Sequence, residues 1–65
     1  KEAEWREQLV AEIRKSLSEL GDIATLYVQL YKSDEHRLVG GVVYEDDRHI
    51  TFVYENGELT YEEEQ

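Results

Sequence analysis

The chain contains no cysteine, no proline and no methionine, and only 4 of its 65 residues are glycine. Without cysteine there is no disulfide framework, no thiolate nucleophile and no cysteine-ligated zinc site. Stability must come from one apolar core, which in so small a domain rarely supplies more than about 3–5 kcal/mol. Oligomerisation is a standard remedy for such a small core, so the sequence favours a search for an association surface.

Basic residues are also scarce. Lys and Arg number 7 against 16 Asp and Glu, which gives a formal net charge of −9 at pH 7. This charge argues against binding to nucleic acid or anionic membranes, and it permits a basic protein partner. The sequence has no apolar run near the ~20 residues of a membrane-spanning helix, and no signal-peptide pattern opens it. We therefore predict no nucleic-acid partner and no membrane partner, and the sequence indicates no cellular location.

Residues 1–20 are rich in Glu, Lys, Arg, Ala, Leu and Gln, which are strong helix formers. Gly21 follows them, at a position where a glycine in the left-handed conformation commonly ends a helix. We therefore predict one helix over residues 1–20. Its apolar residues recur at three- and four-residue steps and form a single stripe: Trp5, Leu9, Val10, Ile13, Leu17 and Leu20.

The rest of the chain reads as strands joined by tight turns. Asn56-Gly57 is the strongest short-range hairpin signal, because a type I′ turn needs positive φ at both positions. We predict two-residue turns at Asp34-Glu35 and Asp46-Asp47 as well. The expected fold is a single α+β domain over residues 1–65, in which the helix packs on a curved, four-stranded antiparallel meander sheet of order 1-2-3-4. The predicted strands are residues 23–33, 36–45, 48–55 and 58–63.

These turns set the register, and the register decides which side chains share a face of the sheet. Val43 would pair with Ile50, and Leu30 with Val39. The face under the helix would then collect Leu26, Val28, Leu30, Val39, Val43, Ile50, Phe52, Tyr54, Leu59 and Tyr61. The opposite, open face would carry Tyr27, Tyr31, Leu38, Val42, Tyr44 and Val53. Because a contiguous exposed apolar patch usually marks an interface, we predict that these six residues form a homodimer interface.

Gly40-Gly41 lies in the middle of a predicted strand and has two interpretations. Gly41 makes room for the ring of Phe52 to lie across it, or the pair marks a β-bulge or a bend that curves the sheet around the helix. We favour curvature. A true bulge would exchange the faces of Leu38 and Val39, and one turn would then be longer than two residues.

Few residues suggest chemistry. His49 lies near Asp46 and Asp47, but one imidazole at a hairpin tip is a poor metal site, and we interpret these residues as turn formers and a strand histidine. An enzyme would need a polar pocket built from His49, Tyr44 and Asp47. We predict no catalytic residue, no metal site, no cofactor and no small-molecule substrate.

Three features are typical of one class of proteins: the helix sequence KEAEWREQLVAEIRKSLSELG, the short turns Asp46-Asp47 and Asn56-Gly57, and the absence of Cys, Met and Pro. In these features the whole chain resembles de novo designed miniproteins that pack one helix on a curved antiparallel sheet. The resemblance rests on style rather than on a diagnostic motif. It implies a structural protein without biochemical activity, and some members of that class form homodimers through the open sheet face.

Two functional hypotheses follow. The first is a structural domain that self-associates as a homodimer through the open face. The alternative is a small acidic inhibitor that mimics nucleic acid and binds a basic partner protein. The acidic residues are spread over the helix, the turns and the last residues of the chain, which counts against the alternative. Salt-sensitive binding to a basic protein would favour it.

Overall fold

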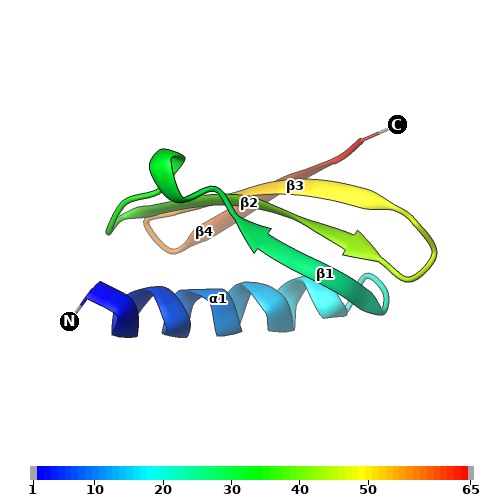
Figure 1. Ribbon diagram of the computed structural model, residues 1–65, viewed down its shortest axis with the longest axis horizontal. Coiled ribbons are helices and arrows are strands. Elements are labelled where there is room, and N and C mark those ends of the chain that lie inside the picture. Colours follow the sequence, from blue (N-terminus) through cyan, green and yellow to red (C-terminus); the bar gives the residue numbers. More distant parts are fainter. Residues whose placement is uncertain (1, 65) are drawn as a thin grey trace.

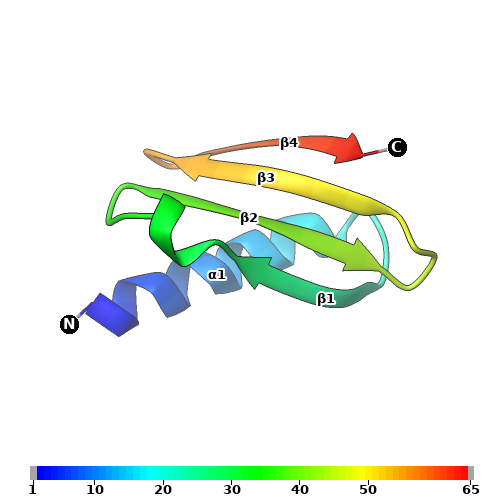
Figure 2. The same cartoon turned by 45° about the horizontal axis from the view of Figure 1, so that its top comes forward.

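The computed structural model describes residues 2–64, which form one helix and one four-stranded antiparallel sheet (Figures 1 and 2). The strands follow the order β1-β2-β3-β4, and the helix lies along one face of the sheet. The predicted fold class and strand order are confirmed. The predicted helix start at Lys1 lies outside the described residues. The elements are α1 (Glu2–Ser18), β1 (Ile23–Val28), the 3-10 helix η1 (Leu30–Lys32), β2 (Arg37–Tyr44), β3 (His49–Glu55) and β4 (Glu58–Glu64).

Helix α1 ends at Ser18, two residues earlier than predicted. The backbone N–H groups of Glu19 and Leu20 donate to carbonyl groups three residues back, at 3.3 and 3.1 Å, instead of four residues back. This tightening is common in the last turn of a helix. It brings the chain around into β1 within a few residues.

Gly21 does not end the helix in the way the sequence suggested. Its φ is 158°, far from the left-handed value near +57°. A Cβ at this position would collide with the Arg48 side chain and would lie 3.1 Å from the ring of Tyr44. The unusual φ and the tight contact with the Tyr44 ring therefore favour glycine here, whereas the Arg48 guanidinium ends a flexible side chain that can shift.

The core lies between α1 and the sheet. Ile13 and Leu17 from the helix are 1% and 0% exposed, as expected from the apolar stripe. Half-buried side chains such as Trp5 and Leu9 pack against this centre. The fully buried apolar residues are Ile13, Leu17, Leu38, Val42, Tyr44, Ile50 and Phe52.

The turn between β2 and β3 is longer than predicted. The Tyr44 N–H donates to the Arg48 carbonyl at 2.9 Å, so the loop holds residues 45–47 rather than Asp46-Asp47 alone. Asp47 has a φ of 72°, and a type I turn followed by a left-handed residue is a common three-residue hairpin loop. The Asp46 carboxylate accepts hydrogen bonds from the Arg48 backbone N–H at 3.2 Å and from Arg48 Nε at 2.9 Å, which hold the loop.

This one extra residue turns every side chain of β2 to the other face of the sheet. Val42 pairs with Ile50, and Val43 pairs with His49. Leu38, Val42 and Tyr44 therefore lie in the core, where their exposed fractions are 0%, 0% and 1%. The predicted placement of these three residues on the open face is wrong, and Val39 and Val43 take positions there instead.

The connection from β1 to β2 also differs from the prediction. Strand β1 ends at Val28, η1 follows, and a bridge between Asp34 and Arg37 closes a turn at residues 35–36. The predicted strand over 23–33 and the turn at Asp34-Glu35 are therefore wrong. The Ser33 hydroxyl accepts the Val39 N–H at 2.9 Å, so a side chain replaces the bond that a longer β1 would have made.

The glycine pair Gly40-Gly41 lies in a regular ladder, because both residues pair without a register shift with β1 and with β3. The bulge that the sequence left open at this pair is absent, and the register shift of the β1–β2 ladder lies between Ile23 and Thr25 of β1. The ring of Tyr27, rather than that of Phe52, occupies the space beside Gly41. Glycine is thus required here by close packing.

The β3–β4 hairpin agrees with the prediction. Asn56 and Gly57 have φ values of 53° and 84°, the positive values that a type I′ turn requires. Tyr54 pairs with Leu59, and Phe52 pairs with Tyr61, as the sequence predicted.

Candidate functional site

The face of the sheet that α1 leaves uncovered is the open face (Figures 1 and 2). Of the six residues predicted to form an interface there, Tyr27 and Val53 lie on this face by register, and Tyr31 belongs to η1 above it. The other three lie in the core. By the alternation of side chains along each strand, the face also carries Val39, Val43, His49, Thr51 and Thr60.

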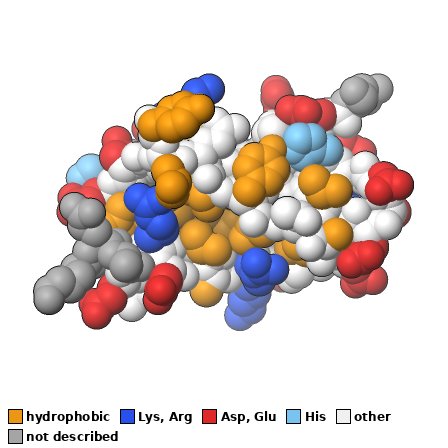
Figure 3. All heavy atoms as spheres, viewed as in Figure 1, with side chains coloured by type: hydrophobic (Ala, Val, Ile, Leu, Met, Phe, Trp, Pro, Cys, Tyr) orange, Lys and Arg blue, Asp and Glu red, His pale blue; other side chains and the backbone are white. Residues whose placement is uncertain are grey.

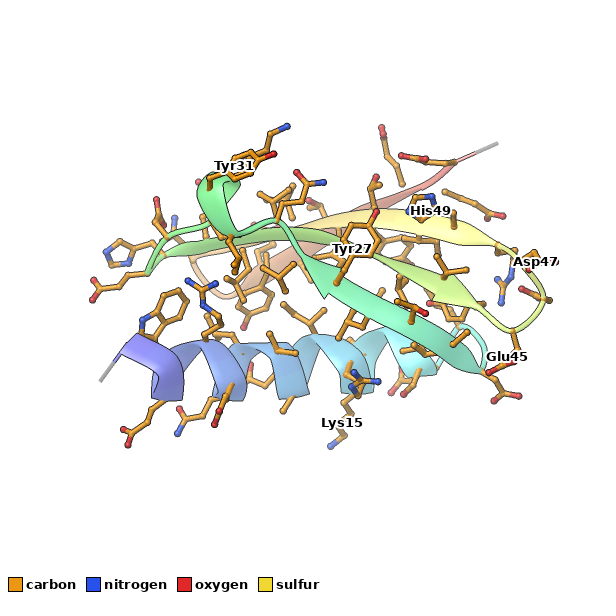
Figure 4. The ribbon with its side chains drawn as sticks, viewed as in Figure 1. Lys15, Tyr27, Tyr31, Glu45, Asp47 and His49 are labelled. Carbon is orange, nitrogen blue, oxygen red and sulfur yellow. The ribbon has the colours of Figure 1, made fainter. Side chains whose placement is uncertain are left out.

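The most exposed apolar side chains of the face belong to η1. Tyr31 is 94% exposed and Leu30 is 64% exposed. The short helix is held by the Lys32 N–H, which donates to the Gln29 carbonyl at 3.1 Å, and by the Ser33 N–H, which donates to the Leu30 carbonyl at 3.3 Å. Figure 1 shows that η1 rises above the sheet on the side opposite α1, and Figure 4 shows Tyr31 at its top. Leu30 and Tyr31 together are called the η1 knob below.

A groove of about 440 Å³ is bordered by the segment that precedes the η1 knob and by β2, β3 and β4. Val39 and Val53 are paired residues of neighbouring strands and provide apolar lining. Thr51, Thr60 and Gln29 add polar lining. This sheet groove and the η1 knob therefore lie close together on the open face.

A chain of three polar side chains braces the opposite end of the face. The Tyr27 hydroxyl lies 2.7 Å from His49 Nε2, and His49 Nδ1 lies 3.2 Å from Glu64 Oε1. Because a carboxylate only accepts, Nδ1 carries a proton toward Glu64, and in the neutral imidazole Nε2 then accepts the Tyr27 hydroxyl hydrogen bond. Figure 4 shows Tyr27 and His49 pointing toward each other. These contacts among Tyr27, His49 and Glu64 hold the ring of Tyr27 over Gly41.

The residues considered for an enzyme site do not come together. Tyr44 is buried on the helix side of the sheet, while His49 lies on the open face and Asp47 in the exposed loop. Among the side chains described, those of residues 4–64, no three from His, Asp or Glu form a group that could hold a metal ion. Across the same residues, α1 falls short of the length and apolarity needed to cross a bilayer.

Charge on the open face is divided between its two halves. Lys32 of η1 and Arg37 of β2 lie on the β1–β2 half, and the Arg37 Nη1 donates to the Lys32 carbonyl at 3.1 Å. The β3–β4 half carries acidic side chains by register: Glu55, Glu58, Glu62 and Glu64. The face is therefore electrically polar across the strands.

The groups with shifted pKa values lie away from this face. Burial raises the pKa of Tyr44, whose hydroxyl donates to the Leu17 carbonyl at 2.6 Å. Hydrogen bonds from Arg48 lower the pKa of Asp46. A hydrogen bond to Glu12 raises the pKa of Tyr54. These shifts report how the hairpins attach to α1 and to each other, and they do not indicate catalysis.

Sequence reasoning missed Leu30, Val39 and Glu64 as residues of the site. The β2 sequence RLVGGVVY has apolar residues in both of its alternating sets, so hydrophobic pattern alone does not choose a face. Only the length of the turn at residues 45–47 decides which set of β2 side chains is buried. Nothing in the sequence signals the contact between Tyr27 and His49, because it crosses two strand pairs.

The chain matches none of the curated proteins. The profile of one family matches residues 4–64, and that family is described as a domain of unknown function, DUF4651. Because the match spans nearly all of the 65 residues, the chain belongs to the DUF4651 family.

Proposed function

We propose that this domain is a non-catalytic association module, and that two copies pair through their open faces. The observation that carries the proposal is the 94% exposed Tyr31 close to a groove on the same face. A projecting side chain and a hollow on one surface are self-complementary. Each copy can place its knob in the groove of the other, as a two-fold interface requires.

Charge and apolar pattern favour a particular arrangement. A two-fold axis parallel to the strands and midway between β2 and β3 places the β1–β2 half of one copy over the β3–β4 half of the other. Val39 of one copy then lies over Val53 of the other. Lys32 and Arg37 face the acidic half of the partner face. Sheets packed face to face in this way lie about 10 Å apart with their strands nearly aligned.

The area available sets the strength of such a pair. The molecule extends 35 × 18 × 18 Å. A 35 by 18 Å face offers roughly 600 Å² on each copy, or about 1,200 Å² in total, the lower limit of specific protein interfaces. Each copy also carries a formal charge of −9, and the repulsion opposes pairing. We therefore expect a weak dimer whose population depends on concentration.

Light scattering on a concentration series tests the proposal. The molar mass should rise from 7.7 kDa toward twice that value as concentration increases. Tyr31→Ser and Val53→Lys should each keep the protein monomeric, because the first removes the knob and the second places a charge in the groove. Leu20→Ser, at a 38% exposed site beyond the end of α1, is the matched control and should dimerise normally.

Circular dichroism must show that each variant is folded. A wild-type mass of 7.7 kDa that does not change up to millimolar concentration would refute the proposal. Equal dimerisation of wild type and Tyr31→Ser would show that the knob is not part of the interface.

A second candidate follows from the acidic half of the open face. Four glutamates of β3 and β4 lie there by register, so a basic protein could bind this half. Such binding would weaken as salt screens the charges. Binding of a basic protein that survives Tyr31→Ser and is lost on substitution of the glutamates would favour this candidate over self-association.

A further inference from the structure

The two free edges of the sheet differ in charge. The sequence of β4, ELTYEEE, carries four glutamates, whereas that of β1, IATLYV, carries no charged residue. Charged side chains on an edge strand hinder pairing with a further strand. Of the two edges, β1 is therefore the one open to an added strand.

The backbone groups that would accept such a strand can be assigned. Gln29 donates its N–H to the Val39 carbonyl at 2.7 Å, so residue 29 forms a hydrogen-bonded pair with β2. Inward and outward groups alternate along an antiparallel strand. The N–H and C=O groups of Leu26 and Val28 therefore point away from β2, toward the free edge.

A second groove, of about 700 Å³, adjoins this edge between α1 and β1. Val10 and Ala11 of the helix and Ile23 of β1 provide its apolar lining. Figure 3, viewed as in Figure 1, shows basic side chains next to apolar ones on this side of the molecule. An added strand at β1 would place alternate side chains over this groove.

The polar lining of the α1–β1 groove is mainly cationic. Arg6, Arg14 and Lys15 line it, against the single anion Glu7. These are three of the 7 basic residues in a chain with a net charge of −9. Arg14 and Lys15 form no ion pair with the side chains described, those of residues 4–64, and Figure 4 shows Lys15 projecting from α1 into solvent. Cations gathered on an apolar groove of an acidic protein match an anionic partner.

From the open edge and the cationic groove together, we infer that β1 binds an extended acidic segment of another protein as a fifth strand. The segment hydrogen-bonds to the outward groups of Leu26 and Val28. Its helix-facing apolar side chains lie in the groove over Val10 and Ile23, and flanking carboxylates meet Arg14 and Lys15. Addition of a strand to a sheet edge is an established mode of peptide recognition, in which backbone bonds give affinity and alternate side chains give specificity.

The probe is a fluorescent seven-residue peptide with glutamate at both ends and valine at the two inner helix-facing positions, separated by threonines. Fluorescence anisotropy should show saturable binding that weakens as salt rises from about 0.05 to 0.3 M. The double variant Arg14→Glu, Lys15→Glu should bind at least about tenfold more weakly. Lys32→Glu reverses one charge on the other side of the sheet and should leave peptide binding unchanged.

N-methylation of the probe tests strand addition directly. Methyl groups on the alternate N–H groups that face β1 should abolish binding, whereas methyl groups on the other set should not. In NMR spectra, the amides of Leu26 and Val28 should shift and gain protection from exchange. The amides of Leu59 and Tyr61 on β4 should not respond.

Two results would overturn the inference. One is equal binding by the acidic peptide and by a peptide with lysine in place of its glutamates, since the groove would then recognise only apolar side chains. The other is assembly of the protein alone into oligomers larger than a dimer, in which the amides of Leu26 and Val28 are protected from hydrogen exchange. That outcome would mean that β4 of another copy, itself acidic, occupies the edge. Neither readout depends on Tyr31, so the failure of this inference and the failure of open-face dimerisation are distinguishable.

Discussion

Tyr44 joins the β2–β3 hairpin to the end of α1. Its side chain is 1% exposed, and its hydroxyl donates to the Leu17 carbonyl at 2.6 Å. The Arg48 guanidinium lies 4.6 Å from the centre of the Tyr44 ring and donates to the Leu20 carbonyl at 2.6 Å. The last carbonyl groups of a helix lack partners within the helix. Side chains from the hairpin donate to the Leu17 carbonyl in the last turn of α1 and to the Leu20 carbonyl just beyond it, so the helix end and the hairpin stabilise each other.

Tyr44→Phe should therefore lower the free energy of unfolding by about 0.5–1.5 kcal/mol near neutral pH, because it removes the hydroxyl hydrogen bond to the Leu17 carbonyl and leaves that carbonyl only the Leu20 backbone N–H at 3.1 Å. It should also change the alkaline behaviour. Burial raises the Tyr44 pKa above 10.0, so the folded state favours the neutral phenol. The associated stability is fully present below pH 10.0 and is lost as the pH rises toward the raised pKa.

Urea unfolding at pH 7 and near pH 11 measures both effects. Wild type should lose more stability between the two pH values than Tyr44→Phe does. Tyr31→Phe is the matched control, since it removes the same hydroxyl from a tyrosine that is 94% exposed. Parallel losses in wild type and Tyr44→Phe would show that the buried phenol is not responsible.

At the scale of elements, the loop at residues 45–47 matters most. Asp47 adopts a φ of 72°, a left-handed conformation that costs most L-residues roughly 1–2 kcal/mol and that Asp and Asn tolerate better. The loop is one residue longer than a type I′ turn, and this length sets the face of every side chain in β2. Asp46-Asp47 indicated a hairpin. The length of its loop could not be predicted, because Asp fits several turn types.

Asp47→Val should destabilise the protein by roughly 1–2 kcal/mol, because a β-branched side chain is strained at positive φ. Asp47→Gly should be as stable as wild type or slightly more stable. Glu45→Val introduces the same side chain in the same loop at an ordinary φ and should cost less than half as much. Thermal unfolding of the three variants gives the comparison, and equal costs at positions 45 and 47 would contradict the loop conformation described here.

The other elements differ in how much of their structure could be predicted from the sequence. The helix stripe and Asn56-Gly57 were readable because each has one physical solution: an amphipathic helix, and a turn that needs two positive φ values. The conformation of the segment before β2 could not be predicted from the sequence. Ser33 replaces a ladder bond with its hydroxyl, and this long-range choice lets the chain leave the sheet and form η1.

For the whole molecule, the division of charge on the open face gives a test of the proposed dimer geometry. Glu58→Lys and Lys32→Glu should each weaken dimerisation by about two- to fivefold, the usual worth of an exposed ion pair. The double variant should restore it, since the two residues face each other across the two-fold axis.

Net charge alone predicts a different result. Glu58→Lys makes the chain less acidic, so pairing would strengthen if only overall repulsion mattered. Glu19→Lys, an exposed change of the same charge next to the end of α1, is the control and should strengthen pairing slightly. Sedimentation equilibrium on wild type and the four variants decides between the two accounts, and failure of the double variant to recover would refute the strand-parallel axis.

The absence of catalysis and the resemblance to designed miniproteins stay predictions. The sequence by itself determined the fold class, the order of the strands and the β3–β4 register. Only the tertiary structure decided which face of β2 is buried. Its two alternating sets are both apolar, so burying Leu38, Val42 and Tyr44 instead of Val39 and Val43 depends on one extra residue in a loop and on the partners that Tyr44 finds at the end of α1. A strand has a side-chain period of two, and a difference of one residue therefore exchanges core and surface.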